Sequence, residues 1–430
     1  MKAILAWLGR GRLLELVAPA VVLLAAASAA FAVFQTVHPD ISQCAACDGN
    51  EYLKMVDGSP VPSPRGRRIL LPILIGLLHL DHDGQVTAFL VVNMAAILLV
   101  AVGTGAIVWI ASRRAGIEPR RAATAAIVAG AVFLVLPMGL RWTWYYPVLV
   151  DPFAIALVIG WLLLSISRSS SLRWAGVAVA AAAVLAREPA IIVLPAAALT
   201  QLYYSRDRRA QLPLAAATIL AVALGAVVTS LVPVTGDLRG NPLVFAASWG
   251  VIRIIDPAFR GDLAWSLLVG FGFLPLLWLR RPRSLQAVIE ADVSNGPPLL
   301  MPLVTLLVVG TLVSIVGGAE TQRYLLAASP FALALVMIHV AQNPALDIEL
   351  AVLLAASFLA WQPFTSLLDP AQADQFFAGI YYVLRHAGDA AHWLTDGLWI
   401  ALPLLVGWLV VAVGGAAIAR MQRRRPAAQA

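Results

Sequence analysis

Charged residues are scarce in this sequence, and their scarcity excludes several classes of protein. Only 12% of the 430 residues are Asp, Glu, Lys or Arg, against about 25% in ordinary soluble domains, and 61% are hydrophobic. Mean hydropathy is +0.85, and the apolar residues form unbroken blocks such as 16–33 and 87–111. About 20 such residues cross a bilayer as one helix. The composition excludes soluble enzymes, disordered scaffolds and secreted disulfide-rich domains, and it predicts an integral membrane protein.

Several motifs of catalysis and metal binding are also missing. No Gly-rich phosphate-binding loop occurs, and the histidines lack the His-x-x-x-His spacing of a helical zinc site. The sequence therefore predicts no cofactor and no metal site, and it leaves a divalent metal ion open. The only cysteines, Cys44 and Cys47, fall in a predicted outer loop. An oxidising compartment favours a local disulfide there over a reactive Cys-x-x-Cys pair.

The apolar blocks predict an all-α fold, in which residues 1–430 form one polytopic membrane bundle of about twelve spans, in the range of about eleven to thirteen. Glu15 and the lack of a cleavage site favour a retained first helix over a signal peptide. The apolar piece 69–80 is too short to cross and is expected to lie in the interface or to re-enter. The expected spans are 13–36, 85–111, 122–140, 152–167, 174–186, 189–204, 212–232, 263–279, 298–316, 326–341, 349–361 and 397–419.

The distribution of charge sets the predicted orientation. The net charge is +7, from 30 basic and 23 acidic residues. With both termini in the cytoplasm, the inner side carries +12 and the outer side −5, as the positive-inside rule expects. This pattern accounts for the basic excess without nucleic-acid binding. It predicts a multi-pass protein of the bacterial inner membrane, whose long outer segments at 37–84, 233–262 and 362–396 carry the function.

The first outer segment contains arginines on the side where they are disfavoured. Arg65, Arg67 and Arg68 are retained there against the positive-inside bias, which favours an anionic ligand at the membrane surface. Charge pairing with the loop's own carboxylates or with lipid head groups is the alternative interpretation. Arg187 and Glu188 separate two short predicted spans, so they are expected below the outer surface, where a charge is usually paired or functional.

Polar stretches of the outer segments resemble those of one enzyme superfamily. Residues 48–52 read Asp-Gly-Asn-Glu-Tyr, and residues 68–72 read Arg-Ile-Leu-Leu-Pro. The remaining stretches are Tyr-Tyr-Pro at 145–147 with Asp-Pro at 151–152, Ala-Arg-Glu-Pro at 186–189, and Glu-Thr-Gln-Arg-Tyr at 320–324. Together with the topology, they make the chain resemble the GT-C superfamily of polytopic membrane glycosyltransferases, among them mannosyl- and arabinosyltransferases.

The resemblance implies a reaction and a set of residues. It implies transfer of a sugar from a polyprenyl-phosphate donor, with inversion, to a glycan, lipid or protein hydroxyl on the outer face. A carboxylate of the first outer loop takes the acceptor proton while cations stabilise the leaving phosphate. The implied residues are Asp48, Asp40 or Glu51 as base, Arg67, Arg68, Arg187 and Arg323 at the donor phosphate, and Tyr52, Tyr146, Asp151, Glu188 and Tyr324 at the substrates.

Each of these assignments has an alternative. Asp48 precedes Gly49, and Asp-Gly pairs commonly form turns. Asp151 precedes Pro152, an arrangement typical of a helix N-cap. The aromatic residues at 142–146 are typical of an interfacial belt, and Arg187 could simply neutralise Glu188. A secondary transporter or a flippase of lipid-linked sugars is the second functional hypothesis, although the ionisable residues lie near outer helix ends rather than at the midplane.

Overall fold

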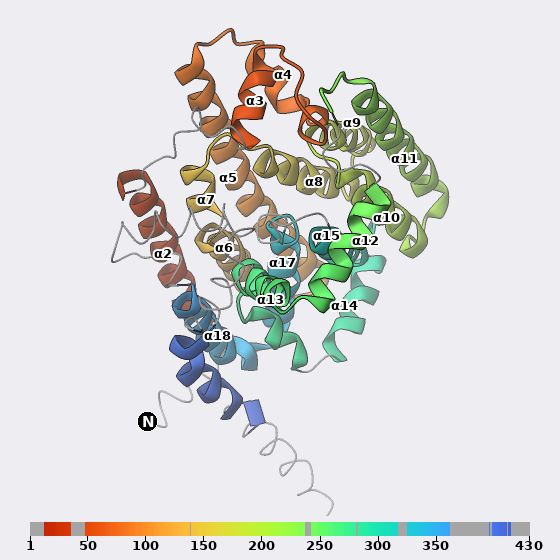
Figure 1. Ribbon diagram of the computed structural model, residues 1–430. Helices are drawn as coiled ribbons and strands as arrows, with labels where there is room; N and C mark the ends of the chain where they lie inside the picture. The colour runs from red at the N-terminus through yellow and green to blue at the C-terminus, as the bar shows by residue number, and fades with distance from the viewer. Residues whose placement is uncertain are drawn as a thin grey trace, which may run out of the picture.

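A computed structural model describes residues 13–35, 48–137, 139–236, 242–280, 283–316, 325–361, 395, 398–410 and 412–413. These residues form helices and turns without any β-strand, which confirms the predicted all-α class (Figure 1). The elements are α2 (Leu13–Gln35), α3 (Asp48–Val56), η2 (Arg65–Arg67), α4 (Leu70–Gly76), α5 (His82–Arg114), α6 (Pro119–Val135), α7 (Leu140–Tyr145), α8 (Asp151–Ser165), α9 (Ser170–Ala186), α10 (Ala190–Tyr204), α11 (Arg208–Leu231), α12 (Pro242–Ile255), α13 (Pro257–Phe271), η3 (Leu274–Leu279), α14 (Arg283–Ser294), α15 (Leu300–Val316), α17 (Ser329–Gln342), η4 (Pro344–Leu346) and α18 (Asp347–Ala360).

Some of these helices are long and apolar enough to cross a membrane. Among the described residues, 3 helices are long and apolar enough by length and composition. They are Leu13–Ala30 within α2, α5 and α11. A fourth is added if α17 and the following helix Pro344–Ala360 form one bent span. Shorter apolar helices of 10–17 residues are α8, α9, α10, α15 and Leu398–Val410. These helices fit a membrane protein, and the number of about twelve spans stays a prediction.

Local sequence signals explain where several helices begin. Asp81 caps α5 by accepting a hydrogen bond from the Gly84 backbone N–H at 3.0 Å, and Asp207 caps α11 in the same way through Ala210 at 3.0 Å. Proline in the first turn starts both α6 and α8, because the missing N–H has no intrahelical partner at that position. The helix starts therefore lie within a few residues of the predicted ones.

The region 242–280 differs from the prediction. α12 lies inside the segment expected to connect two spans. The expected span 263–279 is interrupted, because α13 ends at Phe271 and η3 follows. Gly272 makes this break with a φ of +59°, and a Cβ at this position would lie 2.5 Å from the Ser357 hydroxyl of α18. Hydropathy alone did not reveal the break, because the residues on both sides of the glycine are apolar.

The helix α17 forms the centre of the bundle (Figure 1). Its residues 329–341 are all buried, and it packs against α5, α6 and α15. The chain then bends by 115° into α18. Arg121 of α6 stabilises this bend by donating to the last carbonyl groups of α17, those of Val340 and Ala341, at 2.7 Å each, and to both oxygens of the buried Asp347 carboxylate at 2.7 and 3.1 Å. Carbonyl groups left unpaired at a helix end are thus satisfied by a guanidinium.

Glycines allow α5 and α6 to approach closely. A Cβ on Gly105 of α5 would lie 2.9 Å from the Ala126 carbonyl oxygen, and a Cβ on Gly130 of α6 would lie 2.8 Å from that of Ala101. Both contacts are to backbone atoms, which cannot rotate away as a side chain can. Small residues at such crossings are typical of membrane helices.

The change Gly130→Ala is therefore expected to destabilise the protein by about 1–3 kcal/mol, through overpacking against α5. Gly160→Ala in α8 is the matched control, because its Cβ would meet the nearest atom, Val179 Cγ1, at an ordinary 3.8 Å. In Gly160→Ala, the higher helix propensity of alanine is expected to stabilise the protein by about 0.5–1 kcal/mol. Thermal unfolding in detergent measures both, and equal midpoints for the two variants would contradict the close contact.

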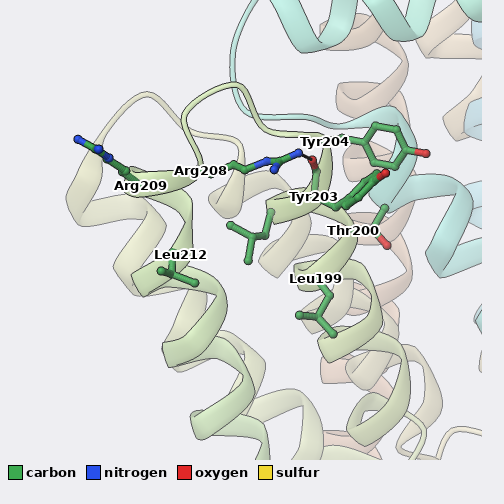
Figure 2. A pocket seen from close by; sticks show the side chains of 8 residues that line it. Leu199, Thr200, Tyr203, Tyr204, Arg208, Arg209 and Leu212 are labelled. Carbon is green, nitrogen blue, oxygen red and sulfur yellow. Dashed lines mark hydrogen bonds between the residues drawn. The ribbon is translucent and has the colours of Figure 1, made fainter.

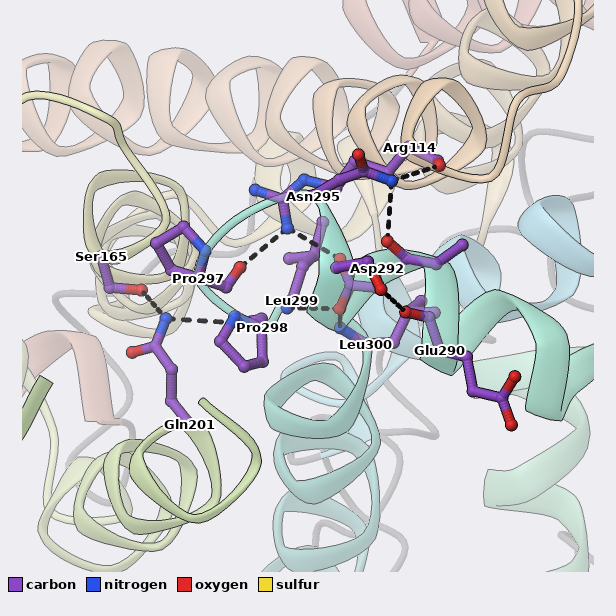
Figure 3. A network of polar contacts seen from close by, with 12 residues as sticks. Arg114, Ser165, Gln201, Glu290, Asp292, Asn295, Pro297, Pro298, Leu299 and Leu300 are labelled. Carbon is purple, nitrogen blue, oxygen red and sulfur yellow. Dashed lines mark hydrogen bonds and ion pairs between the residues drawn. The ribbon is translucent and has the colours of Figure 1, made fainter. Parts of the chain in front are cut away.

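Polar contacts at one end of the molecule join segments that the sequence places on the inner side. Arg114 pairs with Asp292 at 2.7 Å and donates to the Pro297 carbonyl at 2.8 Å, and Asp292 accepts the backbone N–H groups of Leu299 and Leu300 at the start of α15 (Figure 3). Arg206, between α10 and α11, donates to Ser294 at 2.8 Å. These contacts hold the C-terminal ends of α5, α10 and α14 together.

Candidate functional site

The helix α3 positions three of the residues expected at the site. Asp48 lies one turn before both Glu51 and Tyr52, and all three are buried, at 8%, 7% and 0% exposure. The helix packs against η2, α4 and α5. The interpretation of Asp48-Gly49 as a turn is wrong, because both residues are in the first turn of the helix. Glu51 also pairs with Lys54 at 3.6 Å.

Two arginines from η2 and its end face the Asp48 carboxylate. Arg65 Nε donates to Asp48 Oδ1, and Arg68 Nη1 lies 3.9 Å from Asp48 Oδ2. Burial lowers the pKa of the Arg65 guanidinium, but the charge of Asp48 and their hydrogen bond outweigh it, so this pKa is raised above its usual value. The short η2 is possible because Gly66 packs directly on the backbone, where a Cβ would lie 2.6 Å from the Val61 carbonyl oxygen.

Arg68 connects α3 to a segment 120 residues later. Its side chain is 3% exposed, its Nη1 donates to the Tyr52 hydroxyl at 2.8 Å, and its Nε reaches the two Glu188 oxygens at 3.1 and 3.0 Å. Glu188 lies in the short linker between α9 and α10. Three residues predicted separately, Tyr52, Arg68 and Glu188, are therefore brought together. A guanidinium with several fixed partners is well suited to orient carboxylate and phosphate groups.

The neighbouring residue, Arg187, pairs with Asp151. Asp151 is the first residue of α8, and its N-cap is Val150, so the expected N-cap role of Asp151 is wrong. The two partners are almost completely buried, at 5% and 1% exposure. Arg187 thus holds the start of α8 against the α9–α10 linker while Glu188 contacts Arg68. Arg187 and Glu188 are adjacent in the sequence, but Arg187 contacts α8 and Glu188 contacts Arg68.

Tyr146 fixes the start of α3. Its hydroxyl accepts a hydrogen bond from the Gly49 backbone N–H at 2.9 Å, and its ring stacks on Trp142 with centroids 6.1 Å apart. Tyr146 and Trp142 are buried, at 1% and 2% exposure, so their interpretation as an interfacial belt is wrong. Asn93 of α5 supports the same turn by donating to the carbonyl groups of Pro147 and Leu149 at 2.8 Å each.

Among the described residues, one predicted site residue makes no contact with this cluster that can be assigned. Arg67 lies in η2, and its buried Nε has no hydrogen-bond partner among the described residues. In the parts of the chain that the structure describes, no three His, Cys, Asp or Glu side chains gather as a metal-binding group. Residues outside the described parts are Asp40, Cys44, Cys47, Arg323 and Tyr324.

Arg65 is not among the residues that the sequence predicts at the donor phosphate. It is one of three outer arginines, and its position directly after Pro64 gives no sign that it faces Asp48. The backbone connection of the two predicted outer segments was also unexpected: Ser63 N–H donates to the Gly236 carbonyl at 2.8 Å. Both contacts depend on the path of the chain between α3 and α4.

Comparison with protein-family models, with curated proteins and with solved structures finds no match to this chain.

Proposed function

We propose that this chain is a membrane glycosyltransferase that moves a sugar from a polyprenyl-phosphate donor to an acceptor hydroxyl on the extracytoplasmic face. The observation that carries the proposal is the placement of the Asp48 carboxylate beside the guanidinium groups of Arg65 and Arg68. Such a reaction needs a carboxylate that takes the proton of the acceptor and cations that stabilise the leaving phosphate, and this cluster contains both kinds of group. The residues come from the stretches whose pattern resembles the GT-C superfamily.

In the proposed reaction, the acceptor oxygen attacks the anomeric carbon from the face opposite the phosphate, which inverts the configuration. Asp48 takes the hydroxyl proton, the bond between the anomeric carbon and the phosphate oxygen breaks, and polyprenyl phosphate leaves with the electron pair. Arg65 and Arg68 stabilise the negative charge on that leaving phosphate. Asp40 stays the second candidate for the base, and Arg323 a further candidate for the donor phosphate.

The exposure of the cluster indicates the side from which substrates enter. The side chains of Arg65 and Glu188 are 24% and 25% exposed, whereas that of Arg68 is 3% exposed. A donor phosphate that reaches the exposed edge of Arg65 replaces its contact with Asp48 and leaves this carboxylate available to accept a proton. The ion pairs therefore hold the arginines in place before the donor binds.

The charge arrangement supports an outer location for this cluster. Each ion pair described above joins two residues that the sequence places on the same side of the membrane. The pairs of the candidate site belong to the acidic outer side, and those around Arg114 and Arg121 belong to the basic inner side. With the positive side in the cytoplasm of a bacterial inner membrane, transfer takes place on the periplasmic or extracellular face.

A transfer assay tests the proposal. The purified chain in lipid nanodiscs is incubated with radiolabelled polyprenyl-phosphate sugar and a cell-envelope glycan extract. Labelled glycan is expected to appear in equal molar amount with free polyprenyl phosphate, and nanodiscs without protein give the background. If labelled donor crosses between leaflets of sealed vesicles and no polyprenyl phosphate is released, the chain is a flippase and the proposed function is wrong.

A further inference from the structure

A groove of about 730 Å³ lies between α10 and α11, at the end of α10 opposite to the one that follows Glu188 (Figure 2). It is at the inner ends of these helices, where Arg206 joins Ser294 of α14. Its volume is in the usual range of sites for small molecules, about 300–1,000 Å³. The groove is lined by Leu199, Thr200, Leu202, Tyr203, Tyr204, Arg208, Arg209 and Leu212.

The lining has two layers because each helix contributes residues four positions apart. Leu199 and Tyr203 lie on one face of α10, and Arg208 and Leu212 lie on one face of α11. The two leucines form the layer nearer the middle of the helices, and Tyr203 and Arg208 form the layer at their ends (Figure 2). Leu199, Leu212 and Tyr203 are 52%, 58% and 67% exposed. The groove therefore has an exposed apolar floor, formed by Leu199 and Leu212, and an aromatic and positively charged mouth, formed by Tyr203 and Arg208.

The mouth of the groove is positively charged. The Arg208 guanidinium lies 5.7 Å from the centre of the Tyr203 ring and donates to the Tyr203 carbonyl at 3.1 Å, so it is held over the groove. Arg209 is exposed at the next position of α11, and its side chain points away from Arg208 (Figure 2). The nearest acidic residue in the sequence, Asp207, accepts the Ala210 N–H as the cap of α11. Arg208 thus presents its positive charge to a ligand in the groove.

We propose that this groove binds one anionic phospholipid of the cytoplasmic leaflet, with its phosphate against Arg208 and its acyl chains along Leu199 and Leu212. An anionic phospholipid supplies both a negative charge for the guanidinium and apolar chains for the leucines, whereas an uncharged lipid would leave the guanidinium without a counter-charge. The leaflet follows from the predicted orientation, in which 205–211 is an inner loop. The proposal does not depend on sugar transfer.

Native mass spectrometry of the full-length protein in detergent tests this site, with phosphatidylglycerol, phosphatidylcholine and inorganic phosphate as separate probes. The wild-type protein is expected to retain one phosphatidylglycerol with at least about tenfold preference over phosphatidylcholine, and to retain no inorganic phosphate. The double variant Arg208→Gln/Arg209→Gln is expected to lose that preference. Thermal unfolding without lipid checks that the variant is folded.

Arg113→Gln is the matched control for this experiment. Arg113 is an exposed arginine of the predicted inner side that also lies over an aromatic ring, 5.9 Å from Trp109, and donates to a backbone carbonyl, that of Ile117. It lies outside the groove, so its loss should leave the preference unchanged. An equal loss in this control, equal retention of the two lipids by the wild-type protein, or retention of inorganic phosphate would overturn the proposal. Even if the double variant fails to fold, equal retention of phosphatidylglycerol and phosphatidylcholine by the wild-type protein would still contradict the proposal.

Discussion

Replacing Asp48 with Asn is expected to lower sugar transfer by about 10²–10⁴-fold while the amount of folded protein stays the same. The amide is similar in size and can still contact Arg65, but it cannot accept the acceptor proton. Glu188 continues to hold Arg68 in this variant. The measurement is the initial rate of transfer from labelled polyprenyl-phosphate sugar in membranes, normalised to protein detected by immunoblot.

The control for this change is Asp83→Asn, which removes one negative charge from the same outer segment. Asp83 is exposed in the first turn of α5, away from the residues that contact Asp48. Its activity should equal that of the wild-type protein. Full activity in Asp48→Asn and also in Asp40→Ala would refute the proposed mechanism with either of these residues as the base. Loss in Asp40→Ala alone would assign the base to Asp40.

Arg187→Met is expected to lower the free energy of unfolding by about 3–5 kcal/mol, because it leaves the Asp151 carboxylate buried without its guanidinium partner. Asp151 is 1% exposed, so water cannot replace the lost contact. The expected result is a strong fall in the thermal unfolding midpoint and in the yield of monodisperse protein. Arg173→Met, an arginine of the predicted inner side, is expected to change the midpoint little.

The double variant Asp151→Asn/Arg187→Met separates a structural role from a role at the donor. Removing both charges together leaves no buried ion, so most of the lost stability is expected to return. Transfer is then expected to stay within about tenfold of the wild-type rate, because the pair positions the linker that carries Glu188 rather than touching the phosphate. A folded double variant as inactive as Asp48→Asn would instead place Arg187 at the donor.

Much of the candidate site was predictable because polar residues stand out in an apolar sequence. The stretches at 48–52, 68–72 and 186–189 each contain charged residues next to apolar segments, and the structure joins these stretches through Arg68. Their mutual contacts were not predictable. The 120 residues between Arg68 and Glu188 include four long helices, and no local spacing indicates which ends of those helices meet.

The limits of the helices were also predictable only where local sequence signals determine them. The helices α8 and α10 begin and end close to the predicted positions, because a proline precedes or begins each of them and polar residues follow. The break at Gly272 was not predictable, because a glycine within an apolar run does not by itself indicate a positive φ, and its contact with Ser357 joins residues far apart in the sequence. Burial of Tyr146 and Trp142 was missed for a similar reason: an aromatic run has the same composition in an interface and in a core.

Arg68 donates at the same time to Tyr52 of α3 and to Glu188 of the α9–α10 linker. In the proposed function, a donor phosphate that draws this guanidinium toward itself would take hydrogen bonds from both partners at once. The affinity for the donor and the contact of α3 with the linker would then be thermodynamically coupled, and each would weaken the other by the same free energy. Under this proposal, donor binding loosens the contact between α3 and the α9–α10 linker.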